Sequence, residues 1–164
     1  MKKLFIIRHA KSDQRFFGND FERPLNERGK TDASIMAHRL LEKQPVIEAF
    51  VSSPAKRARK TAEVFTTIYG NAAEDMILVS ALYHASSEVF YEVIAAFPDK
   101  FNSIAIFSHN PGITFFVNDM VDGIKIDNMP TCGIFTVQAN INQWGGFAKA
   151  KKELINFDYP KLSV

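Results

Sequence analysis

The chain has 164 residues, of which 46% are hydrophobic and 23% charged, and its mean hydropathy is −0.10. These values exclude a disordered chain and predict one domain, residues 1–164, with a sizeable hydrophobic core. The net charge is only +2, but residues 1–60 carry 14 Lys and Arg against 7 Asp and Glu, which predicts an anionic ligand for this part of the chain.

Short apolar segments that are typical of β-strands alternate with amphipathic patterns that are typical of helices. In chain order we predict strands at 3–9, 48–53, 76–80, 103–109 and 133–139. The helices predicted between them run from about Asn26 to about Glu42, from after Pro54 to about Tyr69, from Ser86 or Ser87 to a residue before Pro98, and onward from Pro111-Gly112. The continuous apolar runs Leu4–Ile7 and Ile104–Phe107 indicate strands that are covered on both faces. With an antiparallel hairpin expected around Trp144, this order predicts a three-layer α/β/α sandwich with a mostly parallel central sheet.

The single cysteine and the hydropathy pattern indicate the compartment. Cys132 cannot form an internal disulfide, and we expect it to be a buried, unreactive thiol within a strand, in the segment "TCGIFTVQ". No apolar stretch has the length of a membrane-spanning helix, and the run Leu4–Ile7 is too short for a signal peptide. We therefore expect a cytoplasmic protein with no membrane partner.

Polar and charged side chains follow three of the predicted strands. The first strand leads into Arg8 and His9, the second into Ser53 and, three residues after Pro54, Arg57, and the fourth into His109. In open α/β sheets the ligand site lies at the carboxyl ends of the strands. We therefore expect these side chains to meet at one edge of the sheet.

Two arginines and two histidines together suit the chemistry of a phosphoryl group. Guanidinium groups bind phosphate oxygens in a bidentate manner, a neutral imidazole can attack phosphorus, and a second imidazole can donate a hydrogen bond to the transition state. Helices that begin near Pro54 and Pro111 would direct their positive dipole ends toward the same anion. A nucleophilic His9 must be neutral, which predicts that its second ring nitrogen donates to a backbone carbonyl.

Four segments, in order, resemble the histidine phosphatase superfamily: "FIIRHAKSD", "RPLNERG", "SSPAKRARKTAEVF" and "FSHNPGI", which together span residues 4 to about 115. The short chain and the "RHAKS" opening resemble the small phosphohistidine phosphatase branch, which is SixA-like. The resemblance implies a phosphoglycerate mutase-like fold, His9 as the phosphorylated nucleophile, and Arg8, Arg57 and His109 as the phosphate pocket. It also implies that neither a metal nor another cofactor takes part.

Arg23, Lys11 and His84 are further candidates for substrate binding at the rim of the pocket, and for Arg23 and Lys11 an ordinary surface position is the alternative. Many members of the superfamily carry an acid after the third strand that protonates the leaving group, whereas this chain has His84 near that place and Glu88 one helical turn later. An alkoxide leaving group needs such an acid more than a phosphoramidate nitrogen does. The departure favours phosphohistidine, or another labile phosphate, as the substrate.

Several alternatives remain at this point. One is a small-molecule phosphomonoesterase of the same superfamily, and another is a non-catalytic phosphate-binding module, although the chain keeps both histidines and both arginines. A metal site is not expected because the four histidines lack ligand spacing. The basic segment 56–60 lacks the aromatic residues and the recognised module of a nucleic-acid site, so we expect no nucleic-acid partner.

Overall fold

The computed structural model describes residues 1–162. The strands in this part of the chain are β1 (Lys2–Arg8), β2 (Ala49–Ser52), β3 (Ile77–Leu78), β4 (Ser103–Ser108), β5 (Ile134–Ala139) and β6 (Lys152–Asp158). The α-helices are α1 (Glu27–Lys43), α2 (Lys56–Ile68), α3 (Ser87–Ala95) and α4 (Gly112–Met120). Short 3₁₀ helices lie in the connections, among them Asp20–Glu22 before α1.

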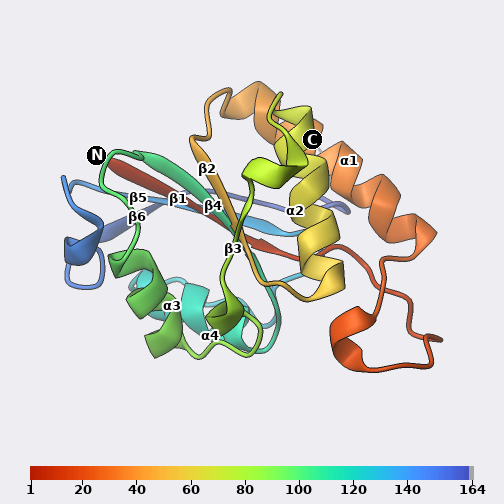
Figure 1. Cartoon of the computed structure of the whole chain (residues 1–164). Coiled ribbons are helices and arrows are strands. Elements are labelled where there is room, and N and C mark those ends of the chain that lie inside the picture. Colours follow the sequence, from red (N-terminus) through yellow and green to blue (C-terminus); the bar gives the residue numbers. More distant parts are fainter. Residues whose placement is uncertain (163–164) are drawn as a thin grey trace.

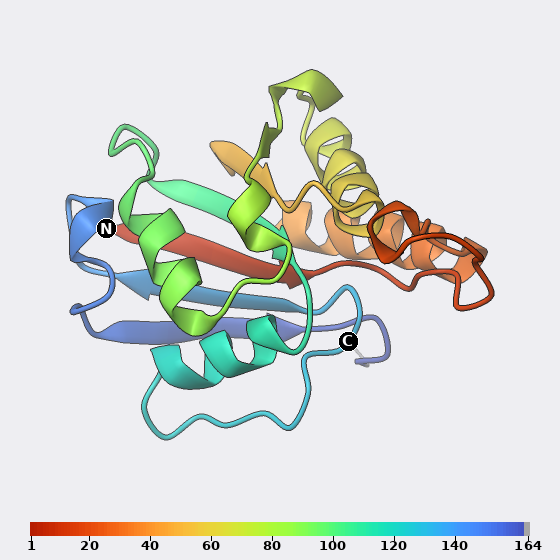
Figure 2. The ribbon, with the colours of Figure 1, turned by 60° about the horizontal axis from the view of Figure 1, so that its bottom comes forward.

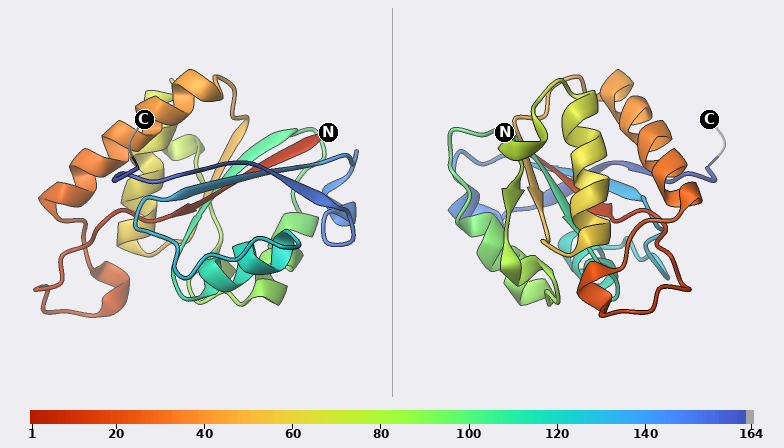
Figure 3. Two further views of the ribbon diagram at one scale, coloured as in Figure 1. Left: turned by 180° about the vertical axis from the view of Figure 1, so that it is seen from behind. Right: turned by 45° about the vertical axis from the view of Figure 1, so that its right-hand side comes forward.

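The six strands form one sheet in the order β3-β2-β4-β1-β5-β6. The pairs β2–β3, β2–β4 and β1–β4 are parallel, whereas β1–β5 and β5–β6 are antiparallel. Helices α1 and α2 lie on one side of the sheet and α3 and α4 on the other (Figures 1 and 2), and the view from behind shows the layers in profile (Figure 3, left). The predicted three-layer α/β/α sandwich with a mostly parallel sheet is confirmed.

The central strand β1 contributes side chains to both hydrophobic layers. Leu4 and Ile6 pack into the cluster beneath α3 and α4, while Phe5 and Ile7 pack into the cluster beneath α1 and α2. All four side chains are fully buried, which is why the run reads as continuously apolar in the sequence. Because helices cover β1 on both faces, the strand is held in place, and so is Arg8, its last residue.

The helix boundaries agree with the sequence, but one strand is shorter than expected. The Asn26 side chain accepts a hydrogen bond from the Gly29 amide (2.8 Å) at the start of α1, and Ser86 caps α3 through the Val89 amide (3.3 Å). The strand predicted at 76–80 contracts to β3, whose two side chains are exposed. As the edge strand, β3 pairs only with β2, and short edge strands limit unwanted pairing between molecules.

The carboxyl-terminal hairpin consists of β5 and β6, as predicted around Trp144. Trp144 is buried in the connection, where its indole nitrogen donates to the Phe101 carbonyl (2.9 Å). Cys132 lies just before β5 rather than within a strand, with a φ of +58°. It is fully buried, and burial raises the pKa of its thiol, as expected for an unreactive side chain. No helix among residues 1–162 is long and apolar enough to cross a membrane.

Candidate active site

The carboxyl ends of three adjacent strands meet at one edge of the sheet. In the order β2-β4-β1, Ser53 follows β2, His109 follows β4 and His9 follows β1, so His109 lies between the other two. The His9 amide donates to the Ser108 carbonyl (3.1 Å), and the centroids of the His9 and His109 rings are 5.2 Å apart. The fold thus brings together the two histidines that the sequence singled out.

His9 is held as a neutral imidazole with one ring nitrogen free. Its side chain is almost fully buried, and its Nδ1 lies 2.7 Å from the Ala10 carbonyl oxygen. Because a carbonyl can only accept, Nδ1 carries the proton and Nε2 keeps its lone pair. Burial, with further contributions from His109, Arg8 and Arg57, lowers the pKa of His9 well below its ordinary value. The hydrogen bond expected for His9 is therefore present.

Three buried side-chain nitrogens in this cluster have no hydrogen-bond partner within residues 1–162. They are Nε of Arg8, Nε of Arg57 and Nδ1 of His109. Arg8 is fixed by Nη1, which donates to the Met129 carbonyl (2.8 Å). Leaving a buried polar group unpaired costs about 1–3 kcal/mol, so three of them on residues at this edge of the sheet indicate a place for a ligand that supplies oxygen acceptors.

Arg57 reaches the cluster from the first turn of α2. Its side chain is buried, and its Nη1 and Nη2 donate to the main-chain oxygen (2.7 Å) and to Oδ2 (2.9 Å) of Asp20. Both α2 and α4 begin without a side-chain cap, and both follow strands that end at this edge. The first turns of these helices therefore direct their positive ends toward the same region, as the sequence predicts.

Asp20 is a residue of this site that the sequence analysis missed. Its carboxylate accepts hydrogen bonds from Arg57, from Arg23 (3.0 Å) and from the Tyr83 hydroxyl (2.7 Å). The hydrogen bonds from Tyr83 and Arg57 hold the pKa of Asp20 well below its usual range. The spacing of Asp20 and Arg23, three residues apart, signals their ion pair, but the contacts with α2 and Tyr83 depend on the tertiary fold.

A cavity of about 440 Å³ opens onto the cluster. It is lined by Arg8, His9, Lys11, Ser12, Gln14, Arg23, Arg57, Asn110 and Thr131. The lining includes two of the three rim candidates, Lys11 and Arg23, and it contains four cations and no carboxylate. Asn110 stands beside His109 in the segment "FSHNPGI", whereas Ser12, Gln14 and Thr131 were not singled out from the sequence, because single polar residues in loops carry no distinctive pattern. The charge of the cavity suits an oxyanion.

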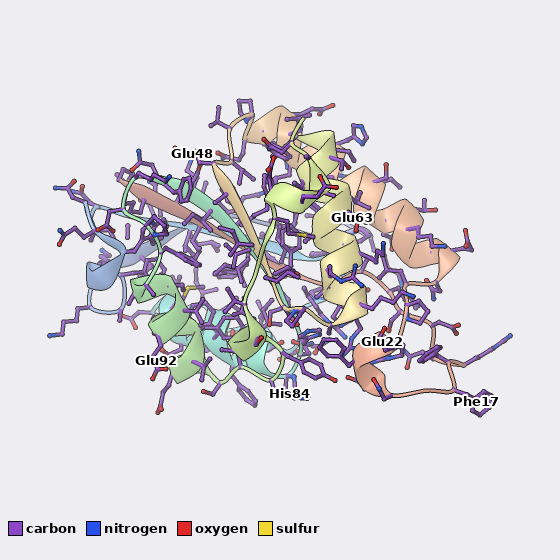
Figure 4. The ribbon with its side chains drawn as sticks, in the orientation of Figure 1. Phe17, Glu22, Glu48, Glu63, His84 and Glu92 are labelled. Atoms are coloured by element: carbon purple, nitrogen blue, oxygen red, sulfur yellow. The ribbon has the colours of Figure 1, made fainter. Side chains whose placement is uncertain are left out.

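His84, the third rim candidate, lies beside the neighbouring cavity of about 350 Å³, which Tyr83, His109 and Asn110 also line. Its ring centroid is 4.0 Å from that of Tyr83. Figure 4 shows His84 and Glu22 at the same end of the molecule. The lining of this second cavity also contains no carboxylate, and Glu88 lies exposed in the first turn of α3. Among residues 1–162, no three His, Cys, Asp or Glu side chains lie close enough together to hold a metal ion.

Comparisons with known proteins agree with this geometry. Residues 4–82, which include Arg8, His9 and Arg57, match the model of the histidine phosphatase superfamily (branch 1). A solved structure of SixA from Agrobacterium tumefaciens, with an unverified assignment as phosphohistidine phosphatase, is 26% identical, with 97% of this chain and 98% of that chain covered and a TM-score of 0.80.

Two further solved structures share the fold. The protein histidine phosphatase SixA, complexed with tungstate, is 21% identical with a TM-score of 0.81, and the alignment covers 96% of this chain and 97% of that one. The mycobacterial glucosyl-3-phosphoglycerate phosphatase, complexed with inorganic phosphate, is 14% identical with a TM-score of 0.68, over 99% and 100% of the two chains. The sheet and its two helical layers are therefore common to structures that hold phosphate or an analogue of it.

Proposed function

The chain belongs to the histidine phosphatase superfamily, and from this premise we propose that it hydrolyses protein phosphohistidine through a phosphorylated His9. The observation that carries the proposal is the state of His9. Its Nε2 lone pair is free, its ring is neutral, and it lies beside three buried nitrogens that lack partners. This arrangement supplies a nucleophile together with groups that bind the oxygens of its target.

The reaction proceeds in two displacements. The Nε2 lone pair of His9 attacks phosphorus, the bond from phosphorus to the substrate nitrogen breaks, and the released imidazole takes a proton from water. A second water then attacks the phosphorus of phosphorylated His9, which yields inorganic phosphate and neutral His9. Arg8, Arg57 and His109 bind the three equatorial oxygens throughout, the positioning and charge stabilisation that phosphoryl transfer requires.

The choice of a phosphoramidate rests on the leaving group. Neither cavity is lined by a carboxylate, and Asp20, which contacts Arg23 and Arg57 of the lining, already accepts three hydrogen bonds from side chains. Its low pKa keeps it ionised at neutral pH, so it has no proton to donate. An imidazole leaving group can take a proton from solvent on its own ring, whereas an alkoxide depends on an acid of the enzyme.

The second candidate is a phosphomonoesterase that acts on a small molecule. The similarity in fold to the mycobacterial glucosyl-3-phosphoglycerate phosphatase supports it, as does a cavity of about 440 Å³ lined by four cations. Lys11 and Arg23, as substrate-binding residues, would then contact further anionic groups of such a molecule. His84 would contact the part of either substrate that extends toward the neighbouring cavity.

One panel of rates tests both candidates. Protein phosphohistidine, phosphoramidate, p-nitrophenyl phosphate and sugar phosphates are each offered to the wild type, to His9→Ala and to the control His38→Ala, in which an exposed histidine of α1 is removed. We expect the nitrogen-linked substrates to react fastest, His9→Ala to be inactive and His38→Ala to equal the wild type. Labelled phosphate on His9 should be trapped by alkaline denaturation.

The outcomes separate the candidates clearly. Faster cleavage of alkyl phosphates than of phosphoramidates would replace the first candidate with the second. Substantial turnover by a folded His9→Ala protein would remove His9 as the nucleophile. Binding of inorganic phosphate without turnover of any substrate would indicate a phosphate-binding module.

A further inference from the structure

The side chain of the second histidine, His109, makes one hydrogen bond within residues 1–162, and its partner is a buried serine. His109 Nε2 lies 2.7 Å from Ser53 Oγ, and Ser53 is fully buried at the end of β2. The Ala55 amide also donates to this hydroxyl oxygen (3.2 Å). The other ring nitrogen of His109, Nδ1, is buried and has no partner within residues 1–162.

From these contacts we propose that Ser53 is a positioning residue that sets the tautomer of His109. The Ser53 hydroxyl donates its proton to Nε2, so the ring proton of His109 is on Nδ1 and Nδ1–H is presented to the phosphoryl group. This role deepens the proposed phosphatase function and assigns a task to a residue that touches neither substrate nor reacting atom.

Counting hydrogen bonds decides between the two tautomers of a neutral ring. With the proton on Nδ1, the Ser53 O–H donates to Nε2, the Ala55 amide donates to Oγ, and only Nδ1–H awaits a partner. With the proton on Nε2, that N–H donates to Oγ, and the Ser53 hydroxyl hydrogen has no acceptor within hydrogen-bonding distance among residues 1–162. The Nδ1 lone pair would then be unpaired as well. Because each buried unpaired group is costly, the first tautomer is favoured.

The imidazole ring of His109 is neutral near neutral pH because of its surroundings. Burial, and then the positive charge of Arg57, lower the pKa of His109 to about 3. The ring therefore carries a single proton near neutral pH, and its position matters. A bare Nδ1 would present a lone pair to the phosphate oxygens and repel them, whereas Nδ1–H donates to them.

The two histidines thus have the same tautomer but present opposite functions. In His9 the Ala10 carbonyl binds Nδ1–H, which leaves the Nε2 lone pair free as the nucleophile. In His109 the Ser53 hydroxyl occupies Nε2, which leaves Nδ1–H free as a donor. The acceptor-only carbonyl and the donating hydroxyl explain how two imidazoles 5.2 Å apart take different roles.

The tautomer can be observed directly by NMR. Spectra of ¹⁵N-labelled protein that correlate ring nitrogens with ring carbon-bound protons distinguish protonated from bare nitrogen, and His109→Gln assigns the signals. At neutral pH we expect a protonated Nδ1 and a bare Nε2 for His109 in the wild type. Ser53→Ala should move the ring toward the other tautomer or a mixture. Addition of inorganic phosphate should shift the Nδ1–H resonance without removing the proton.

The matched control is Ser52→Ala. Ser52 is the adjacent, equally buried serine, but its hydroxyl donates to the Ser53 carbonyl (2.8 Å), whereas the ring of His109 is hydrogen-bonded to Ser53. Ser52→Ala should leave the His109 spectrum unchanged. Ser53→Cys keeps the size of the side chain with a weaker donor and should lie between wild type and Ser53→Ala, which keeps the test usable if alanine disturbs the fold.

A double-mutant cycle tests the catalytic consequence. Ser53→Ala should lower kcat about tenfold, because an unpaired buried nitrogen shifts the tautomer equilibrium by at least that order. In the His109→Gln background the same substitution should change kcat less than about twofold. An equal loss in both backgrounds would overturn the positioning role, since a merely structural serine would be needed in either.

The NMR spectra test the tautomer of His109, and the rates test the proposed phosphatase function, so each measurement can contradict its own proposal without affecting the other. A wild-type His109 with its proton on Nε2 overturns the assignment of the tautomer, whether or not the protein is a phosphatase. If the spectra agree and no phosphorylated substrate is hydrolysed, the tautomer is supported and the proposed function alone is wrong.

Discussion

Both terminal nitrogens of Arg57 are bound by Asp20, one by its main-chain oxygen at 2.7 Å and one by its carboxylate at 2.9 Å. This contact ties the 3₁₀ helix that contains Asp20 to the first turn of α2. It leaves Nε of Arg57, buried and unpaired within residues 1–162, as the part of the guanidinium that is available to an oxyanion. Asp20 therefore controls the direction of a group that the reaction is proposed to use.

Asp20→Ala should lower kcat about tenfold, because a guanidinium that loses its partner turns away from the productive position. Inhibition by inorganic phosphate should not weaken, since the substitution also removes a negative charge beside a cavity lined by cations. Steady-state kinetics with the chosen phosphoramidate measure both effects. The control is Asp13→Ala in the same loop, where the removed carboxylate accepts a hydrogen bond from the Arg15 amide. An unchanged kcat in Asp20→Ala would contradict the positioning role.

Arg57→Ala should lower kcat/KM by roughly 100-fold or more, because one donor to the developing charge contributes about 3 kcal/mol. The matched control is Arg59→Ala, a partly exposed arginine on the same helix. Circular dichroism of both variants checks that α2 remains folded. A loss of less than about tenfold in Arg57→Ala would remove Arg57 from the reaction.

Gly112→Ala should lower the free energy of unfolding by about 2 kcal/mol, the usual size of an overpacking defect. A methyl group on Gly112, the first residue of α4, would overlap the Ala85 carbonyl oxygen in the loop that contains His84. Activity should fall as well, because this backbone contact lies beside His109. Urea denaturation measures the stability. Gly145→Ala, with open space around the added methyl, should be close to neutral; equal stability of the two variants would contradict the close packing.

The two buried histidines should make the protein less stable as the pH falls. The pKa of His109 is lowered to about 3, and that of His9 also lies well below its ordinary value, whereas both are near 6.5 when unfolded. Below pH 6.5 the unfolded state therefore binds more protons than the folded one. Stability is retained above pH 6.5 and is lost toward pH 3, by up to about 1.4 kcal/mol per pH unit for each histidine.

Urea denaturation at several values between pH 7 and pH 4.5 measures this dependence before most carboxylates titrate. His109→Gln should remove one histidine's share of the slope, with His38→Gln as the control that removes an exposed histidine. A slope that is the same in His109→Gln and in the wild type would contradict the neutral, buried state of His109.

Much of the fold could be predicted because its signals are local. The run Leu4–Ile7 shows a strand covered on both faces, and Asn26 caps its helix through the Gly29 amide three residues later. The length of β3 could not be predicted, because its two residues pair with a single neighbour at the edge of the sheet and neither is buried.

The residues of the candidate site also fall into two groups, those that local sequence signals indicate and those that only tertiary contacts bring to the site. Arg8 ends an apolar strand and His9 follows it directly, so the sequence alone indicated their position. Asp20 was missed because a carboxylate next to a basic segment looks like ordinary surface charge. Only the packing of its 3₁₀ helix against α2 and Tyr83 shows that it binds Arg57.

The sequence by itself determined which chemical groups stand at the strand ends, and the excess of positive charge in the first 60 residues, which predicts an anionic ligand. The hydrogen bond from His9 to the Ala10 carbonyl is also a local feature, because it joins two adjacent residues and does not depend on contacts between distant segments. Only the tertiary structure decided the partner of His109. The strand order β2-β4-β1 places Ser53 on one side of His109 and His9 on the other, and contacts between distant segments depend on that order.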